Sequence, residues 1–423
     1  MSLLIANARV LDPASGSDFI GHVGIKNGKI ASIGKTVPKE KFARTLDAKG
    51  LWLMPGIVDL AARFREPGQT AKASIRSETR AAQASGITTV VIPPDTHPVV
   101  DTPAVVDRIH SKAAAGGLDI RVLGALTKGL GGEALAEMSA LKQAGCVGVG
   151  NAGFGLRDSL VGRRALEYAQ GLGLTVHVFA QNPALANQGC AHEGPVATRM
   201  GLPPIPVAAE VSAIRFWISL VEDTGARVHF GRLSTAKGAG LVESAQRRGL
   251  AVTADVAAHQ LFLTDADVEG FNAMCHVIPP LRSSEDRDGL REAVGRGIIG
   301  AICSDHQPHE ADAKINPFPL TEPGISAMET LLPLTLKLIE TKVLKPLEAV
   351  ARLTHGPAQI AGIDCGLIRV GHDAHLVLVD PALRWTLRAE KLVSAGRNTP
   401  FDGHSFRGRV RQTLFSGQAV YES

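Results

Sequence analysis

Side chains able to carry chemistry are concentrated in two short stretches of this chain. The first runs from 54 to 68 and reads Met-Pro-Gly-Ile-Val-Asp-Leu-Ala-Ala-Arg-Phe-Arg-Glu-Pro-Gly, with an apolar run that ends at Asp59. The second, 304–309, reads Ser-Asp-His-Gln-Pro-His and follows another apolar run. A carboxylate beside imidazoles at the end of a buried strand can act as a general base or bind a metal ion. Both stretches are therefore candidates for one shared site.

The segments around these stretches predict an α/β barrel. Between about 55 and 369, short apolar runs alternate with segments of helical periodicity, which is typical of repeated βα units and a parallel sheet. Eight strands are expected, near 55–61, 88–92, 119–124, 146–151, 174–180, 227–232, 251–256 and 299–304. Eight units match a closed (β/α)8 barrel, in which functional groups lie at the carboxyl ends of the strands.

Both ends of the chain are rich in short strand-like runs separated by Gly and Asp turns. Runs of this kind cover 3–10, 22–26 and 29–33, and others cover 374–379 and 407–421. We expect the two ends to pair in space. The predicted organisation is a discontinuous β-sandwich domain of residues 1–54 and 370–423, and a barrel of residues 55–369.

Composition limits the class of protein. Of the 423 residues, 45% are hydrophobic and 20% are charged, which is typical of a soluble globular protein. The net charge of +4 is small, and no basic block or aromatic stripe indicates a nucleic-acid partner. The five cysteines are widely spaced, so neither a disulfide framework nor a zinc knuckle is indicated. With no apolar run of about 18 residues and no leader pattern, a cytoplasmic protein without a membrane segment is expected.

The 54–68 stretch resembles the first-strand signature of the cyclic amidohydrolases, and most closely that of dihydroorotases. In that family it reads Pro-Gly-x-x-Asp-x-His-x-His-x-Arg-Glu-Pro-Gly, and the two His side chains hold a catalytic zinc. Ala61 and Arg63 stand at these two positions here, while Asp59 and Arg65 are retained. The resemblance covers nearly the whole chain, including Asn398-Thr-Pro-Phe-Asp-Gly403.

Other metal positions of the family are also changed. After the fourth strand the family carries Asp-Asp-Gly or a carbamylated Lys, whereas this chain has Asn151 and Ala152. The ligand His of the fifth strand becomes Phe179, and that of the sixth becomes Arg232. His177, two residues before Phe179 and one layer deeper, is expected to be a hydrogen-bonded core residue rather than a displaced ligand.

The substrate positions show a similar pattern. The family's Met-Pro-Asn-Thr-x-Pro after the second strand becomes Pro-Pro-Asp-Thr-His-Pro, and Asp95 opposes an anionic substrate because a carboxylate only accepts hydrogen bonds. The Asn before Pro-Pro-Leu-Arg becomes Ile278. His229 on the sixth strand and His259 after the seventh are retained.

The eighth strand keeps the family's Ser-Asp-His-x-Pro-His. In the family this Asp, here Asp305, is a metal ligand and the general base, and His306 supports the loop. Without a metal to lower the pKa of water from about 15.7 toward about 7, Asp305 would face an unactivated nucleophile. A structural role for Asp305 is predicted.

Arg63 and Arg232 occupy former ligand positions and oppose a metal. A divalent ion about 4 Å from one Arg charge is repelled by roughly 8 kcal/mol at an effective dielectric of about 20. We hypothesise that one or both arginines pair with Asp59 or Asp305 and tie the strands together where the metal would be. The alternative is that both side chains point to solvent.

The pattern resembles the inactive dihydroorotase homologues that some bacteria carry. Those proteins associate with the catalytic chains of aspartate transcarbamoylase, so the resemblance implies a non-catalytic assembly subunit in pyrimidine biosynthesis, within a homo- or hetero-oligomer. No zinc and no other cofactor is expected. One alternative is an active cyclic amide hydrolase with a relocated metal, or a metal-free lyase or isomerase that uses Asp305. Another is a small-molecule sensor.

Overall fold

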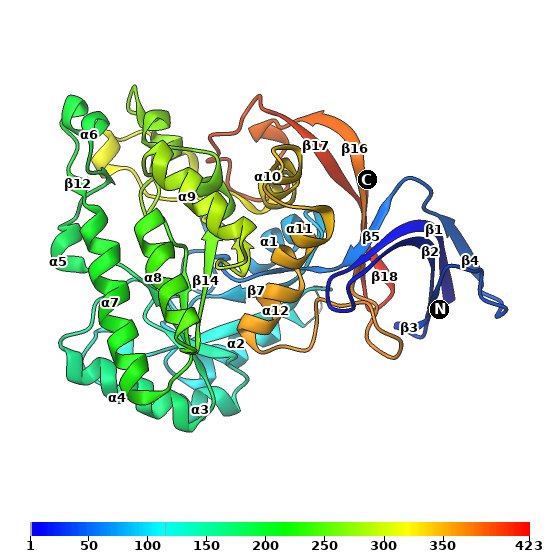
Figure 1. Cartoon of the computed structure of the whole chain (residues 1–423), viewed down its shortest axis with the longest axis horizontal. Helices are drawn as coiled ribbons and strands as arrows, with labels where there is room; N and C mark the ends of the chain where they lie inside the picture. Colours follow the sequence, from blue (N-terminus) through cyan, green and yellow to red (C-terminus); the bar gives the residue numbers. More distant parts are fainter. Residues whose placement is uncertain (1, 115) are drawn as a thin grey trace.

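The computed structural model describes residues 2–114 and 116–423, and a parallel eight-stranded sheet forms its larger part. The strand order follows the chain, and the sheet is surrounded by helices (Figure 1). All eight predicted barrel strands are confirmed, and each is short and mainly apolar. They are β6 (Ile57–Asp59), β7 (Ile87–Ile92), β8 (Asp119–Ala125), β9 (Gly148–Gly150), β10 (Thr175–Phe179), β13 (Val228–Gly231), β14 (Val252–Ala257) and β15 (Ala301–Cys303).

The barrel is closed between its first and last strands by residues just beyond the strand ends. Ala62 and His306 form a parallel bridge, with the Arg63 amide donating to the His306 carbonyl at 2.8 Å. One layer below, the backbone amide of Ser304 donates to Asp59 Oδ1 at 2.9 Å. These contacts form the seam of the barrel, where the first and last strands meet. The seam joins the two stretches that the sequence singles out.

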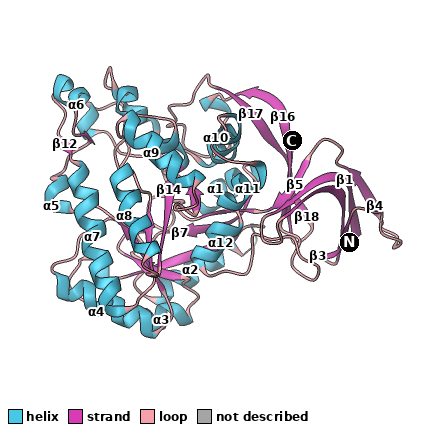
Figure 2. Ribbon diagram, in the orientation of Figure 1, coloured by secondary structure: helices cyan, strands magenta, loops and turns pink. Residues whose placement is uncertain are grey.

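Helices cover the outside of the barrel (Figure 2), and many begin at a residue whose side chain caps the first turn. Asp158 Oδ1 accepts from the Val161 amide at 3.0 Å, and Thr235 Oγ1 accepts from the Gly238 amide at 2.9 Å. The α-helices are α1 (Ile75–Ala84), α2 (Pro103–Ala113), α3 (Met138–Gln143), α4 (Ser159–Gly171), α5 (Pro183–Ala186), α6 (Pro195–Met200), α7 (Val207–Thr224), α8 (Ala236–Arg247), α9 (Ser284–Gly295), α10 (Met328–Glu340), α11 (Pro346–Leu353) and α12 (His355–Ala361). Two short strands, β11 (Ala191–His192) and β12 (Pro204–Ile205), pair beside them.

The two chain ends form a separate β domain, as predicted. β5 lies between β1 from the N-terminal segment and β16 from the C-terminal segment, so the strands are linked into one eight-stranded sheet. It curves from the far edge of the molecule to the barrel (Figure 1). Its strands are β1 (Ser2–Asp12), β2 (Ser17–Lys26), β3 (Lys29–Gly34), β4 (Arg44–Asp47), β5 (Trp52–Pro55), β16 (Leu376–Thr386), β17 (Ser405–Phe415) and β18 (Gln418–Glu422).

Apolar burial holds the β domain together and joins it to the barrel. Ile5, Val23, Leu53 and Leu376 belong to a core inside the curved sheet. Val377, its neighbour on β16, is also buried but belongs to the main barrel core, because successive side chains on a strand point to opposite faces. Among the described residues, no helix is long and apolar enough to cross a bilayer.

Candidate functional site

Asp305 lies at the centre of the barrel mouth, with an arginine on each side. Its side chain is 1% exposed, and its Oδ1 lies 3.5 Å from Arg63 Nη1 and 3.2 Å from Arg232 Nη1. Its second oxygen accepts from Gln307 Nε2 at 3.2 Å. The hypothesis that one or both arginines pair with Asp59 or Asp305 is confirmed, with both arginines on Asp305, and the alternative that they point to solvent is wrong.

Arg63 has a second carboxylate partner. Its Nε donates to Asp95 Oδ2 at 2.8 Å, and the two side chains are 13% and 19% exposed. Asp95, which the sequence marked only as unfavourable for an anionic substrate, therefore balances the second positive charge. Arg63, Arg232, Asp95 and Asp305 form a network, here called the mouth cluster, with no net charge.

Arg232 contacts an aromatic ring as well as Asp305. Its Cζ lies 4.7 Å from the ring centroid of Phe179, a cation–π distance. Burial opposes its charge, yet the nearby carboxylates of Asp305 and Asp255 raise the pKa of Arg232 above its ordinary value. Phe179, at the position of a family ligand, thus serves as a platform for the arginine at another.

Of the two carboxylates that the hypothesis named, Asp59 is the one that does not pair with an arginine. It is fully buried on the barrel seam, where it accepts from the Ser304 hydroxyl, the Ser304 amide and the Ala61 amide. These donors occupy its oxygens one layer below the mouth cluster. Burial raises the pKa of Asp59 to about 6, despite the donors.

This raised pKa predicts a pH dependence of stability. Asp59 is titrated near pH 6 in the folded protein and near 3.9 when unfolded, so between these values the folded state binds more protons. The stabilisation from protonating Asp59 is complete below about pH 4 and is lost as the pH rises through about 6. Relative to Asp59→Asn, the wild type should therefore gain roughly 2 to 3 kcal/mol as the pH falls from about 7 to 4. Urea unfolding at several pH values measures this difference, and a constant difference would contradict it.

A histidine pair lies below the mouth cluster, inside the barrel. The rings of His177 and His229 are 5.1 Å apart edge to face, and His229 Nε2 lies 2.9 Å from Asp255 Oδ2. A hydrogen-bonded core residue was predicted, but His177 is half-buried and its Nε2 has no hydrogen-bond partner among the described residues. Gly148 lies close to the ring, since a Cβ on it would be 3.0 Å from that nitrogen. Burial lowers the pKa of His177 to about 3, so it is neutral.

The other retained residues of the vestigial site hold loops. His306 Nε2 contacts Glu78 Oε2 at 2.8 Å, and its Nδ1 accepts from the Ala327 amide at 3.0 Å. Arg65 Nε donates to the Pro308 carbonyl at 3.1 Å, while burial and the charge of Arg63 lower the pKa of Arg65 to about 10. These contacts tie the loop after β15 to α1 and to the loop after β6.

His259 and the residues after β9 show no site chemistry either. His259 is buried, and burial lowers its pKa to about 4. Asn151 Oδ1 accepts from Thr127 Oγ1 at 2.8 Å, and its amide donates to the Phe154 carbonyl at 3.1 Å. Ala152 has a left-handed backbone with φ of 49°. An amide therefore closes a loop where the family carries metal-binding carboxylates or a Lys.

The donor groups around the mouth cluster do not suit zinc. A cavity of about 220 Å³ opens above it, lined by Arg63, Arg232, Phe179 and Gln307 among others. Below Arg232 only about 40 Å³ remains, beside Ala61 and Ala152. Among the described residues, no three His, Cys, Asp or Glu side chains are grouped to hold a metal ion. Zinc needs about four neutral or anionic donors, whereas two guanidinium groups stand here.

Two carboxylates of the site were missed from the sequence. Asp255 supports His229 and also accepts from the Arg232 amide at 2.5 Å, and Glu78 supports His306. Asp255 interrupts the strand Val-Thr-Ala-Asp-Val-Ala, and a charge inside a buried strand is a signal that a partner lies across the barrel. Glu78 gave no comparable signal, because acidic residues are ordinary in the first turn of a helix.

Sequence comparisons agree with the architecture described above. One family description, "Amidohydrolase family", matches residues 203–420, and another, "Dihydro-orotase-like", matches residues 50–238. The L-hydantoinase (dihydropyrimidinase) of Arthrobacter aurescens is similar in structure, with a TM-score of 0.88 and 25% identity over 99% of this chain and 96% of that one. A barrel with a β domain from both chain ends is thus the amidohydrolase architecture.

Curated relatives identify the branch. A "Dihydroorotase-like protein" of Pseudomonas aeruginosa is 48% identical over 100% of both chains, and one of Pseudomonas putida is 46% identical over 100% of this chain and 99% of its own. A "Dihydroorotase" of Anaeromyxobacter dehalogenans is 41% identical over 99% of this chain and 98% of its own. The chain belongs to the dihydroorotase-like amidohydrolase family.

Proposed function

We propose that this chain is a catalytically inactive member of the dihydroorotase-like family. One observation carries the proposal: Arg63 and Arg232 stand at positions that hold zinc ligands in the family and form ion pairs with Asp305. The guanidinium groups of the two arginines lie where members of the family hold the metal ion. The family's chemistry depends on that metal to activate water, and the donor set here does not suit it.

The contacts of Asp305 also oppose a metal-free reaction. Its two oxygens contact Arg63, Arg232 and Gln307, so neither is free to accept a proton from a substrate unless one of these contacts breaks. The two retained histidines near it are also unsuited to proton transfer, because His259 is buried and His229 is held by Asp255. The cluster is better suited to holding strands together than to transferring protons.

The positive role that we propose is assembly. The family resemblance includes inactive homologues that associate with the catalytic chain of aspartate transcarbamoylase, and we propose the same partner and a cytoplasmic pyrimidine-synthesis complex for this chain. Isolation under mild conditions from its own host, followed by native mass measurement, tests this. The expected result is co-isolation with that catalytic chain at fixed stoichiometry. Isolation of the chain alone, as monomer or dimer, would contradict the assembly role.

An active cyclic amide hydrolase is the second candidate, because relatives at 41% identity carry the name "Dihydroorotase". This function requires that the protein turn over substrate, either with a metal bound at a different place or without a metal. The direct assay is hydrolysis of dihydroorotate and cyclisation of carbamoyl aspartate, alongside measurement of bound zinc. We expect neither turnover nor stoichiometric zinc, and turnover abolished by Asp305→Asn would establish the second candidate instead.

A further inference from the structure

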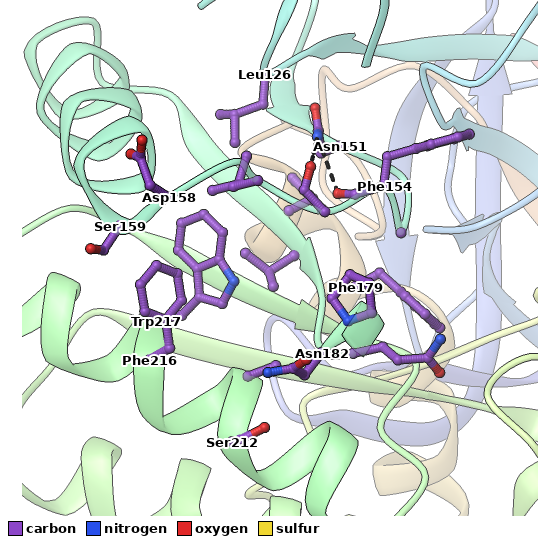
Figure 3. Close-up of a pocket in the computed structure, with 18 residues that line it drawn as sticks. Leu126, Asn151, Phe154, Asp158, Ser159, Phe179, Asn182, Ser212, Phe216 and Trp217 are labelled. Carbon is purple, nitrogen blue, oxygen red and sulfur yellow. Dashed lines mark hydrogen bonds between the residues drawn. The ribbon is translucent and has the colours of Figure 1, made fainter. Parts of the chain in front are cut away.

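A pocket of about 260 Å³ lies outside the mouth cluster, between the loop after β9, strand β10 and helices α4 and α7. Figure 3 shows Phe216 and Trp217 of α7 on one side, Phe179 on the other and Asn151 and Leu126 beyond them. Pockets for drug-sized ligands occupy about 300 to 1,000 Å³, so this one suits a single ring with a small substituent.

The walls of the pocket are mainly aromatic. Phe179, Phe216 and Trp217 line it, and Phe154 at its rim is 56% exposed. Trp217 is only 8% exposed, so its indole contacts mainly protein and the pocket. Flat aromatic walls pack best against a planar ring, in offset or edge-to-face contact.

The charge of the lining disfavours an anionic ligand. Asp158 contributes a carboxylate, and no Lys or Arg side chain lines the pocket. One Asp158 oxygen caps α4 through the Val161 amide at 3.0 Å, and the other lies 4.0 Å from Arg157 Nε. An anion would meet this carboxylate without a cationic partner in the lining. Two residues with side-chain amides, Gln181 and Asn182, also line the pocket.

Asn182 Oδ1 already accepts from the Ala184 and Leu185 amides. The NH2 group of Asn182 and the side-chain amide of Gln181 are therefore the groups with which a ligand carbonyl or amide would form hydrogen bonds. From these features we propose that this pocket is a binding site for a small, uncharged, planar aromatic molecule carrying an amide or carbonyl group. The site is separate from the proposed assembly role, and either can fail without the other.

Phe179 connects the pocket to the mouth cluster. One side of the ring carries Arg232 at 4.7 Å, and the ring also lines the pocket. The cavity above the mouth cluster shares Phe154, Phe179 and Gln181 with the pocket. A ligand in the pocket would therefore contact the platform of Arg232 without entering the mouth.

Benzamide is the probe that tests the site, with benzoate as its charged analogue and cyclohexanecarboxamide as its non-planar one. Trp217 provides the signal, because the other two tryptophans, Trp52 and Trp385, lie on β5 and β16 of the β domain. Saturable quenching is expected with a Kd of about 1 mM or tighter. The two analogues should bind at least about tenfold more weakly, and Trp217→Phe should remove the signal while calorimetry still detects binding.

Matched variants locate the site. Ala213→Phe fills the pocket and should abolish binding, whereas Ala208→Phe places the same side chain on an exposed position of α7 and should leave the Kd unchanged. Gln181→Ala should weaken benzamide binding by about threefold or more, because it removes one of the two side-chain amides in the lining. This variant keeps the test valid if Ala213→Phe does not fold. Absence of saturable binding, or equal affinity for benzamide and its two analogues, would overturn the proposal.

Discussion

Replacing Asp305 with alanine is expected to lower the free energy of unfolding by about 3 to 5 kcal/mol. Removing one member of a buried ion pair leaves the other charge without compensation, and Arg232 is only 10% exposed. Arg63 would keep Asp95, so most of the loss should come from Arg232. Equilibrium unfolding in urea measures the effect, and a loss below about 1 kcal/mol would show that the mouth cluster does not stabilise the barrel.

Two control variants distinguish the effect of a buried ion-pair network from that of an ordinary surface ion pair. Asp223→Ala removes a partner of Arg163 at 2.6 Å, but the Asp223 side chain is 53% exposed, so a loss of about 0 to 1 kcal/mol is expected. The double variant Asp305→Leu with Arg232→Met replaces both charges by apolar groups and should recover more than half of the loss. Failure to recover would mean that volume rather than charge explains the single variant.

Restoring the family's ligands is expected to restore zinc binding. The variant carries histidine at 61, 63, 179 and 232 and retains Asp305, and we expect it to hold about one zinc per chain after dialysis. The wild type should hold none above background. Repulsion of roughly 8 kcal/mol from one nearby arginine corresponds to about six orders of magnitude in affinity, and two arginines are removed.

A control variant without the two charges shows whether repulsion or missing donors explains the lack of zinc binding that is expected for the wild type. The double variant Arg63→Gln with Arg232→Gln removes both charges but supplies no imidazole, and it should still bind no zinc. Elemental analysis of the three proteins gives the answer directly. Stoichiometric zinc in the wild type would overturn the proposal of an inactive site, and its absence from the restored variant would mean that the strand ends no longer hold the ligand geometry.

The mouth cluster offers a way for an amidohydrolase barrel to join its strand ends by ion pairs. A bound ion joins the ends of several strands, because each ligand comes from a different one. Here Arg63 follows β6, Arg232 follows β13 and Asp305 follows β15, so the ion pairs join three of the same strands. Retention of Asp305 among substituted ligands then has a structural reason.

The architecture of this protein could be predicted from its sequence. Buried parallel strands are short apolar runs, and their spacing by helical segments is a local property of the chain, so all eight strand positions were found. The substituted ligand positions were also readable, because they stand at fixed offsets from retained residues such as Asp59 and Asp305. The sequence alone therefore determined that a barrel mouth exists and that two arginines stand at its strand ends in place of ligands.

Only the tertiary structure decided which charges meet. Asp59 and Asp305 were equivalent candidates for Arg63 and Arg232, and the choice depended on depth: Asp59 lies on the closing seam, already bonded to Ser304, whereas Asp305 lies one layer higher. An arginine has several rotatable bonds, so its partner depends on which carboxylates the other strands bring within reach. Asp95, from a strand next to β6 in the sheet, became the second partner of Arg63 for that reason, and no spacing in the sequence specifies such a contact.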